Sequence, residues 1–245
     1  LSREEVMAAA GIKEKQSKTG DGSSASGERV LEQKQPGLYT VIWHPIGGQP
    51  RPETLAALGE LMQTIDGTEL RLAPDETAYI INLTGAEAEK ILEATKETAQ
   101  TKFETSVSCI GASICQVGAR DSQALLQACV KAVGEAQIPD GALPQIHISG
   151  CPSSCGTHQT GPMGFRGGVR MADGKAQPAF VFYLGGNEVQ GKETMGRELG
   201  TMFESEISSF LVKLGKEIAA RGLDFESYRT QYPDGIEKAA AEYLA

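Results

Sequence analysis

Apolar positions change their spacing from one segment of the chain to the next, and each spacing predicts a different element. Runs of β-branched and aromatic residues predict strands, while leucines at intervals of three and four residues predict a helix. The elements predicted in this way are strands over 38–43, 69–72 and 78–83 and a helix over 55–65, with a turn over 73–76 between the last two strands. Thr84 and Glu87 have the spacing of a capping box, which predicts a further helix carrying Ile91 and Leu92. This order is that of most of a ferredoxin-like split βαβ unit.

A second set of apolar patterns begins near Gln100. Asp121 or Ser122 is placed to cap a helix whose apolar face includes Cys129. Further patterns predict strands over 145–149 and 179–184, a long helix over 207–218 and a short helix over 236–243. We therefore predict an α+β protein with a linker or tail over 1–36, a ferredoxin-like half-domain over 37–98 and a mixed α/β domain over 99–245.

The beginning of the chain has a different character. Residues 12–35 are rich in glycine, serine and charge and nearly free of apolar side chains, which predicts a flexible linker or a surface tail. The chain begins at Leu1 rather than at a methionine. We therefore expect a fragment or a processed product of a longer protein.

Composition and charge exclude several classes of partner. The chain has 245 residues and a formal net charge of −9, from 23 basic and 32 acidic residues. Phosphates of nucleic acids and anionic membrane surfaces repel such a chain, so we expect neither as a partner. No apolar run reaches the ~18 residues of a membrane-spanning helix. Five cysteines are too few for a disulfide scaffold and fit a reducing cytoplasm, where clustered cysteines are more often metal ligands or catalysts.

Four of the cysteines form two close pairs, Cys109 with Cys115 and Cys151 with Cys155. Two short loops with two thiolates each can supply the four ligands of an iron–sulfur cluster, and their small residues allow backbone amides to approach the sulfurs. Structural zinc is an alternative, although it prefers pairs separated by ~2–4 residues and the first pair here has a longer spacing. A disulfide within either pair is the other alternative. Cys129 is predicted to be a small buried apolar residue.

A C-x5-C pair followed by a C-x3-C pair resembles the signature of the siroheme and [4Fe-4S] sulfite and nitrite reductases. The loop over 148–156 looks like the G-C-P-N-x-C-G loop of that family, with Ser153 where the family usually has asparagine. The segments over 164–168 and 184–186 look like its G-F and L-G-G segments. The resemblance covers roughly residues 37–220.

The resemblance implies a role for each of the four cysteines. Cys109, Cys115, Cys151 and Cys155 would bind a [4Fe-4S] cluster, and Cys155 would also bridge the cluster to the siroheme iron as the catalytic ligand. Siroheme carries eight carboxylates, so basic residues are candidate partners. The best of these is Arg166, because it lies in a glycine-flanked loop, and the others are Arg71, Arg120 and Arg170.

The implied protein is the C-terminal half of a reductase that carries out the six-electron reduction of sulfite to sulfide or of nitrite to ammonia. Its partners would be sulfite or nitrite, a small electron donor such as ferredoxin, and the missing N-terminal half. That half would carry most of the arginines and lysines that bind the substrate. His147 and His158 flank the second cysteine loop and would either supply protons or act as structural hydrogen-bonding residues. The alternative function is an iron–sulfur electron-transfer module without siroheme.

Overall fold

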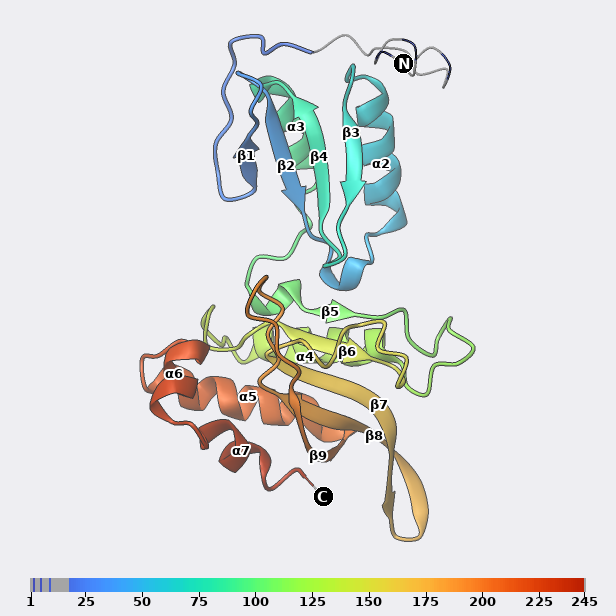
Figure 1. Ribbon diagram of the computed structural model, residues 1–245, viewed down its shortest axis with the longest axis vertical. Helices are drawn as coiled ribbons and strands as arrows, with labels where there is room; N and C mark the ends of the chain where they lie inside the picture. The colour runs from blue at the N-terminus through green and yellow to red at the C-terminus, as the bar shows by residue number, and fades with distance from the viewer. Residues whose placement is uncertain (1, 3–4, 6–8, 10–17, 245) are drawn as a thin grey trace. The chain divides into compact units, whose positions relative to one another are not determined.

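The computed structural model describes residues 2, 5, 9 and 18–244, and its ribbon is shown in Figure 1. The chain divides into two compact units. The first comprises residues 1–44 and 50–98, and the second comprises residues 45–49 and 99–245. Each unit combines a sheet with helices, so the predicted α+β class is confirmed. None of the helices within the described residues has the length and apolar character needed to cross a membrane.

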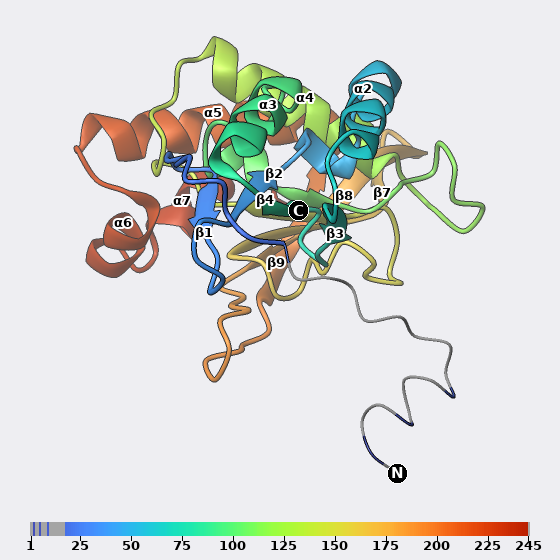
Figure 2. The ribbon, with the colours of Figure 1, turned by 90° about the horizontal axis from the view of Figure 1, so that it is seen from above.

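The first unit is a four-stranded antiparallel sheet with two helices. Its elements are β1 (Val30–Glu32), β2 (Tyr39–Trp43), α2 (Pro52–Gln63), β3 (Glu69–Leu72), β4 (Ala78–Leu83) and α3 (Gly85–Ala94). The strands lie in the order β1-β2-β4-β3. Figure 2 shows α2 and α3 on the same side of this sheet. Alternate residues of the strands, such as Val41 and Ile80, pack against Leu58 of α2 and Ile91 of α3 in the core.

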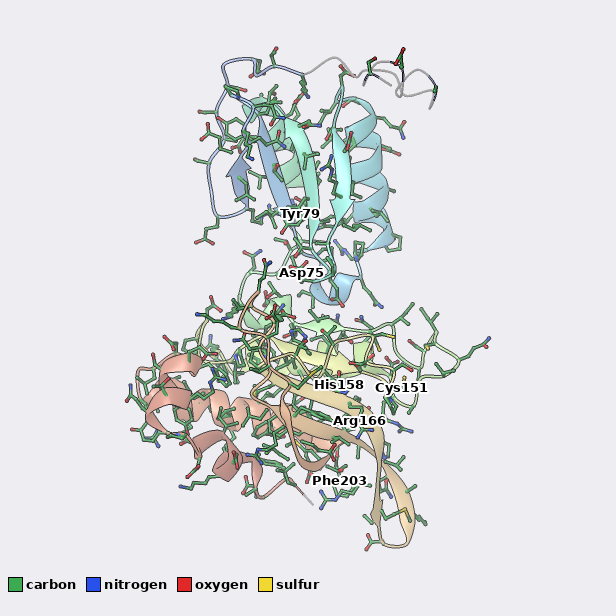
Figure 3. All side chains as sticks on the ribbon, viewed as in Figure 1. Asp75, Tyr79, Cys151, His158, Arg166 and Phe203 are labelled. Atoms are coloured by element: carbon green, nitrogen blue, oxygen red, sulfur yellow. The ribbon has the colours of Figure 1, made fainter. Side chains whose placement is uncertain are left out.

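Local sequence signals explain where helix α3 begins and where the chain turns between β3 and β4. The amide of Thr84 donates to Glu87 Oε2 (2.8 Å) and the amide of Glu87 donates to Thr84 Oγ1, so the predicted capping box starts α3. The predicted turn over 73–76 joins β3 to β4, and its last residue, Glu76, has a φ of +68°. Figure 3 labels Asp75 in this turn and Tyr79 on β4.

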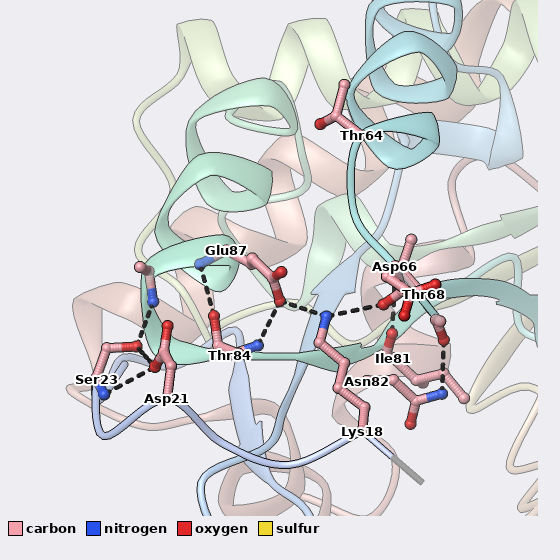
Figure 4. Close-up of polar contacts among 12 residues, drawn as sticks. Lys18, Asp21, Ser23, Thr64, Asp66, Thr68, Ile81, Asn82, Thr84 and Glu87 are labelled. Carbon is pink, nitrogen blue, oxygen red and sulfur yellow. Dashed lines mark hydrogen bonds and ion pairs between the residues drawn. The ribbon is translucent and has the colours of Figure 1, made fainter. Parts of the chain in front are cut away.

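Residues 18–36, which the sequence predicts as linker or tail, lie against the first unit. Lys18 Nζ donates to the carbonyl of Asp66 (2.9 Å) and to Glu87 (2.6 Å), and the amide of Ala86 donates to Ser23 Oγ (2.8 Å), as Figure 4 shows. Strand β1 then pairs with β2. Composition does not reveal these contacts or strand β1, because the residues that they pair with belong to other segments of the chain. Residues 1, 3–4, 6–8 and 10–17 of the predicted tail lie outside the described residues.

The second unit is built on a five-stranded mixed sheet. Its elements are η1 (Ile46–Gly48), η2 (Phe103–Thr105), β5 (Val107–Ser108), α4 (Ser122–Glu135), β6 (Ile146–Ser149), β7 (Met163–Ala172), β8 (Lys175–Leu184), β9 (Arg197–Phe203), α5 (Glu204–Ala220), α6 (Phe225–Gln231) and α7 (Gly235–Ala240). The strands follow chain order across the sheet. The pairs β5–β6 and β6–β7 are parallel, whereas β7–β8 and β8–β9 are antiparallel.

The two faces of this sheet carry different side chains. On one face Phe165 and Phe182 stack with ring centroids 5.1 Å apart, and Phe210 of α5 meets Phe182 at 5.4 Å. This aromatic group belongs to the core that α4 and α5 cover. Because side chains alternate along a strand, the intervening residues face the other way. That opposite face, which is free of these helices, carries a row of paired residues: His147 of β6, Gly164 of β7, Tyr183 of β8 and Glu198 of β9.

Strands β7 and β9 of this unit were not predicted from the sequence, and strand β8 was predicted only in part. Strand β7 contains Gly164, Gly167 and Gly168, which weaken the β signal because glycine has low strand propensity. Strand β8 extends the predicted segment over 179–184 back to Lys175, and the hairpin with β7 projects from the sheet (Figure 1). The polar and apolar residues of strand β9 do not follow a pattern that predicts a strand.

Candidate metal centre

Both cysteine pairs lie in loops that leave the same edge of the second sheet. Cys109 directly follows β5, and Cys151 lies two residues after the end of β6. These strands are parallel neighbours, with Ser108 opposite Ile148. Parallel neighbours end at the same edge of a sheet, so the loops that follow them emerge side by side. The fold therefore brings together two segments that are about forty residues apart in the chain.

Backbone hydrogen bonds join the two loops. The amide of Cys109 donates to the carbonyl of Ile148 (3.0 Å), and the amides of Ala119 and Arg120 both donate to the carbonyl of Gly150 (3.0 and 2.9 Å). The amide of Gly150 donates to the sulfur of Cys109 (3.1 Å). This last bond is the kind of contact that the small residues were predicted to permit. Such N–H donors stabilise a thiolate and tune the reduction potential of any cluster it binds.

Gly156 allows the closest approach of the loops. A Cβ atom there would lie 2.7 Å from the carbonyl carbon of Ile148 and 3.1 Å from the amide nitrogen of Cys109. Gly118 closes the first loop in the same way, since its Cβ would lie 2.8 Å from the Cα of Ala112. A side chain at Gly156 would therefore separate the loop of the first pair from that of the second.

All four paired cysteines are free thiols. Cys109 and Cys115 are partly exposed, Cys151 is buried and Cys155 is exposed. A hydrogen bond from Ser153 lowers the pKa of Cys151, which favours the thiolate form that binds metals. The structure joins Cys109 to the second loop by direct contacts. Cys115 lies in a tight turn, in which its amide donates a hydrogen bond to the carbonyl of Gly111 (2.8 Å).

The chemistry of this donor set fits an iron–sulfur cluster. Within the described residues, no three histidine, cysteine, aspartate or glutamate side chains gather closely enough to hold one metal ion. Each thiolate of a [4Fe-4S] cluster binds a different iron, so its four sulfurs do not converge on a single ion. Four soft thiol ligands on two joined loops, with an N–H donor on one sulfur, match this requirement.

Cys129 lies apart from this group. It is fully buried on α4, and Ser208 Oγ donates to its sulfur at 3.6 Å. Burial raises the pKa of Cys129 to about 12, so the thiol stays protonated. The predicted burial is confirmed, and the side chain packs within the apolar core of the second unit.

The candidate arginines separate into two groups. Arg71 is an exposed residue of β3 in the first unit, and Arg170 donates to the carbonyls of Thr201 (3.3 Å) and Tyr243 (3.0 Å), which is a structural role. Arg166 was predicted in a glycine-flanked loop, but it lies within strand β7, opposite Ser149 at the end of β6. Of these three arginines, Arg166 is therefore the one that lies next to the second cysteine loop.

Arg120 belongs to the same region. Its backbone joins the two cysteine loops, and its Nε atom is buried without a hydrogen-bond partner among the described residues. Its charge also lies close enough to Glu204 to oppose the rise that burial causes in the pKa of that carboxyl.

The histidines also have distinct surroundings. His44 in the first unit lies 3.1 Å from the carbonyl of Asp75. His147 Nδ1 lies 2.8 Å from Thr157 Oγ1, so it ties the second cysteine loop to β6. Burial lowers the pKa of His147, and the nearby Glu188 partly opposes this. His158, labelled in Figure 3, is buried over the opposite face of the sheet.

Sequence reasoning missed Tyr183 and Glu198. Tyr183 Oη accepts a hydrogen bond from Arg166 Nε (3.1 Å) and donates one to Glu198 Oε2 (2.9 Å). Tyr183 lies directly before the L-G-G segment. Its neighbours in the sequence indicate only an aromatic residue within a strand. Glu198 lies on a strand that was not predicted. Only strand pairing places both residues beside Arg166.

Comparisons with known proteins identify relatives of this chain, although no family model matches it. A ferredoxin–nitrite reductase from Synechococcus elongatus is 29% identical over 170 residues, which cover 64% of this chain and 31% of that protein. Sulfite reductase (ferredoxin) 1 from Mycolicibacterium paratuberculosis is 24% identical over 161 residues, which cover 61% of this chain and 29% of that protein.

Solved structures share the fold. The structure of the Mycobacterium tuberculosis NirA protein matches with a TM-score of 0.63 at 21% identity, covering 79% of this chain and 37% of that one. The dissimilatory sulfite reductase I (DsrI) structure matches with a TM-score of 0.53 at 11% identity, covering 92% and 78%. The chain spans about a third of the length of the curated relatives it matches. It is therefore similar to part of the sulfite and nitrite reductases, and it shares the fold of the part that it matches.

Proposed function

We propose that this chain holds a [4Fe-4S] cluster on Cys109, Cys115, Cys151 and Cys155 and forms the C-terminal half of a siroheme-dependent reductase for nitrite or sulfite. The observation that carries the proposal is the pair of joined loops at one sheet edge, with two free thiols in each loop. The relatives named as nitrite and sulfite reductases support it.

The residues of this chain have separable tasks in that reaction. The siroheme and the cluster, when bound, supply the redox chemistry for a six-electron reduction. The amide of Gly150 and the close approach at Gly156 hold Cys109 near the second loop. Cys155, the exposed cysteine, would hold both the cluster and the siroheme. Arg166 carries the positive charge that would face siroheme carboxylates.

The partners follow from the relatives and from the length of the chain. Ferredoxin is the proposed electron donor, because the names of the relatives include it. Nitrite is the favoured substrate, since most of these relatives are named as nitrite reductases. The remaining part of the enzyme would supply most of the groups that grip the substrate. Free thiols favour a reducing compartment such as the cytoplasm.

The second candidate function is an electron-transfer module that binds the cluster but no siroheme. The share of the relatives that the chain covers, about a third, favours this for the isolated chain. The visible absorption spectrum of anaerobically purified protein separates the two functions. A cluster alone gives a broad brown absorption, whereas siroheme adds sharp tetrapyrrole bands.

Two cysteine variants test the proposal at the level of single ligands. Cys155→Ser should lose siroheme binding and reductase activity and should disrupt the cluster, because a hydroxyl is a poor ligand for this soft site. Cys129→Ser is the matched control and should keep its iron. The proposal fails if Cys155→Ser retains the iron content, spectrum and activity of the unsubstituted protein.

A further inference from the structure

The row of paired residues on the sheet face opposite α4 and α5 lies beneath the segment that follows the second cysteine loop. This segment crosses the row at Gly164, where a Cβ atom would lie 2.7 Å from the carbonyl carbon of His158. Because the row has a glycine at this point, the backbone of His158 rests directly on β7. Tyr183 is the neighbour of Gly164 on β8, and its ring centroid lies 5.0 Å from that of His158.

Arg166 is held in place by side chains from two other strands. Its Nε atom donates to Tyr183 Oη (3.1 Å), and its Nη2 atom lies 3.7 Å from Glu198 Oε2. Tyr183 in turn donates to Glu198 (2.9 Å). The Arg166 side chain keeps a quarter of its surface exposed, so the guanidinium is fixed without being enclosed. A guanidinium fixed in this way loses less rotamer entropy when it binds a further ligand.

His158 has unused hydrogen-bonding capacity beside this cation. The residue is 1% exposed, and neither ring nitrogen has a hydrogen-bond partner among the described residues. Buried polar atoms in folded proteins almost always have partners, because an unpartnered one is costly. Burial and the charge of Arg166 lower the pKa of His158 to about 4, so at neutral pH the imidazole offers one N–H donor.

The loop that carries His158 is constrained. Ser154 and Thr157 both have positive φ angles, +59° and +49°, which are unfavourable for residues with a side chain. Thr157 is also held by the ring of His147, and Ser154 bonds to Gln159. Strain of this kind persists where the surrounding structure enforces it, and it often marks functional sites. Here it fixes His158 three residues after Cys155.

We propose that His158 and Arg166 form a binding site for an oxyanion, and that Tyr183 and Glu198 are positioning residues that fix Arg166. The guanidinium would bind two oxygens of the anion, and the imidazole N–H would donate a third bond. This inference rests on the proposed function, which supplies two oxyanions of the same chemistry: the carboxylates of siroheme, and the substrate nitrite or sulfite.

Binding measurements on the full 245-residue chain test the site. The probes are uroporphyrin, an octacarboxylate tetrapyrrole, followed by fluorescence anisotropy, and sodium nitrite or sodium sulfite, followed by calorimetry. We expect His158→Gln and Arg166→Gln each to weaken binding roughly ten- to hundredfold, as loss of a charge-assisted bond implies. Arg197→Gln is the control, because it removes the same charge from an arginine that pairs with Glu237 (2.5 Å).

Comparing the two kinds of probe shows which anion the site binds. A loss for uroporphyrin alone assigns the site to cofactor carboxylates, and a loss for nitrite or sulfite alone assigns it to the substrate; both support the proposal. Tyr183→Phe should weaken binding in the unsubstituted chain and have no further effect in the Arg166→Gln background, as expected of a residue that acts through Arg166.

The proposal is overturned if both variants bind every probe as tightly as the control, or if the unsubstituted chain with its cluster binds none of them. Arg166→Gln keeps the test valid should His158→Gln fail to fold, because the Arg166 side chain is partly exposed. Iron content is measured on the same samples. A chain that carries iron but shows unchanged binding refutes only this site, whereas a chain without iron refutes the proposed function.

Discussion

Gly156→Ala should force the two cysteine loops apart. The added Cβ would lie 2.7 Å from the carbonyl carbon of Ile148 and 3.1 Å from the amide nitrogen of Cys109, and the Cys109 amide donates a hydrogen bond to this Ile148 carbonyl. These neighbours are backbone atoms and cannot rotate away. Gly156 is not one of the glycines with a positive φ, so the effect comes from lack of space rather than from backbone conformation.

The expected loss of stability follows from two contributions. Overpacking a buried site costs ~1–3 kcal/mol. Weakening the bond between Cys109 and Ile148 removes about 0.5–1.5 kcal/mol. We therefore expect Gly156→Ala to lower the free energy of unfolding by about 2–4 kcal/mol, which a domain of ordinary stability survives. The loop shift should also lower the iron content, because Cys109 and Cys155 would no longer hold their positions.

Urea denaturation of the iron-free chain measures the stability change without a contribution from the metal. Iron analysis after cluster reconstitution measures the second effect. Gly168→Ala on β7 is the matched control, since its Cβ would meet no atom within 4 Å and it needs no positive φ. We expect the control to stay within about 0.5 kcal/mol of the unsubstituted chain. If Gly156→Ala matches Gly168→Ala in both measurements, the close approach at Gly156 does not position the cysteine loops.

Three further predictions concern other parts of the chain. Cys129→Ser should cost about 1–3 kcal/mol in urea denaturation, because it buries a hydroxyl in the core, while the iron content stays unchanged. His158 has a pKa of about 4 in the folded chain and an ordinary value near 6.5 when unfolded, so the unfolded state gains the proton first as the pH falls. Compared with His158→Gln, the unsubstituted chain should lose about 2 kcal/mol of stability between pH 7 and pH 5; parallel pH profiles for the two proteins would contradict the burial of this imidazole. Thr84→Ala should destabilise the first unit by about 1 kcal/mol through loss of the α3 cap, and an unchanged urea midpoint would show that the capping box contributes nothing.

Local signals were sufficient for much of the first unit. The strand over 78–83, the turn that precedes it and the capping box at Thr84 each depend on residues that are neighbours in the chain, so periodicity and turn chemistry reveal them. Strand β7 was missed for the opposite reason. Its three glycines weaken the local signal, and two of them, Gly164 and Gly167, lie where the backbones of His158 and Gly150 pack closely on the strand. The ordered contacts of residues 18–36 were missed because they are made with distant segments.

The sequence by itself identified the four cysteines, the small residues between them and the resemblance that gives them a chemistry, because ligand type and spacing are properties of the chain. The tertiary structure decided which of these residues meet. Parallel pairing of β5 and β6 brings the two cysteine loops to one sheet edge, and antiparallel pairing of β7, β8 and β9 places Tyr183 and Glu198 beside Arg166. The physical reason is that hydrophobic spacing reports which side of a strand is buried, whereas strand order and register depend on contacts between residues far apart in the chain.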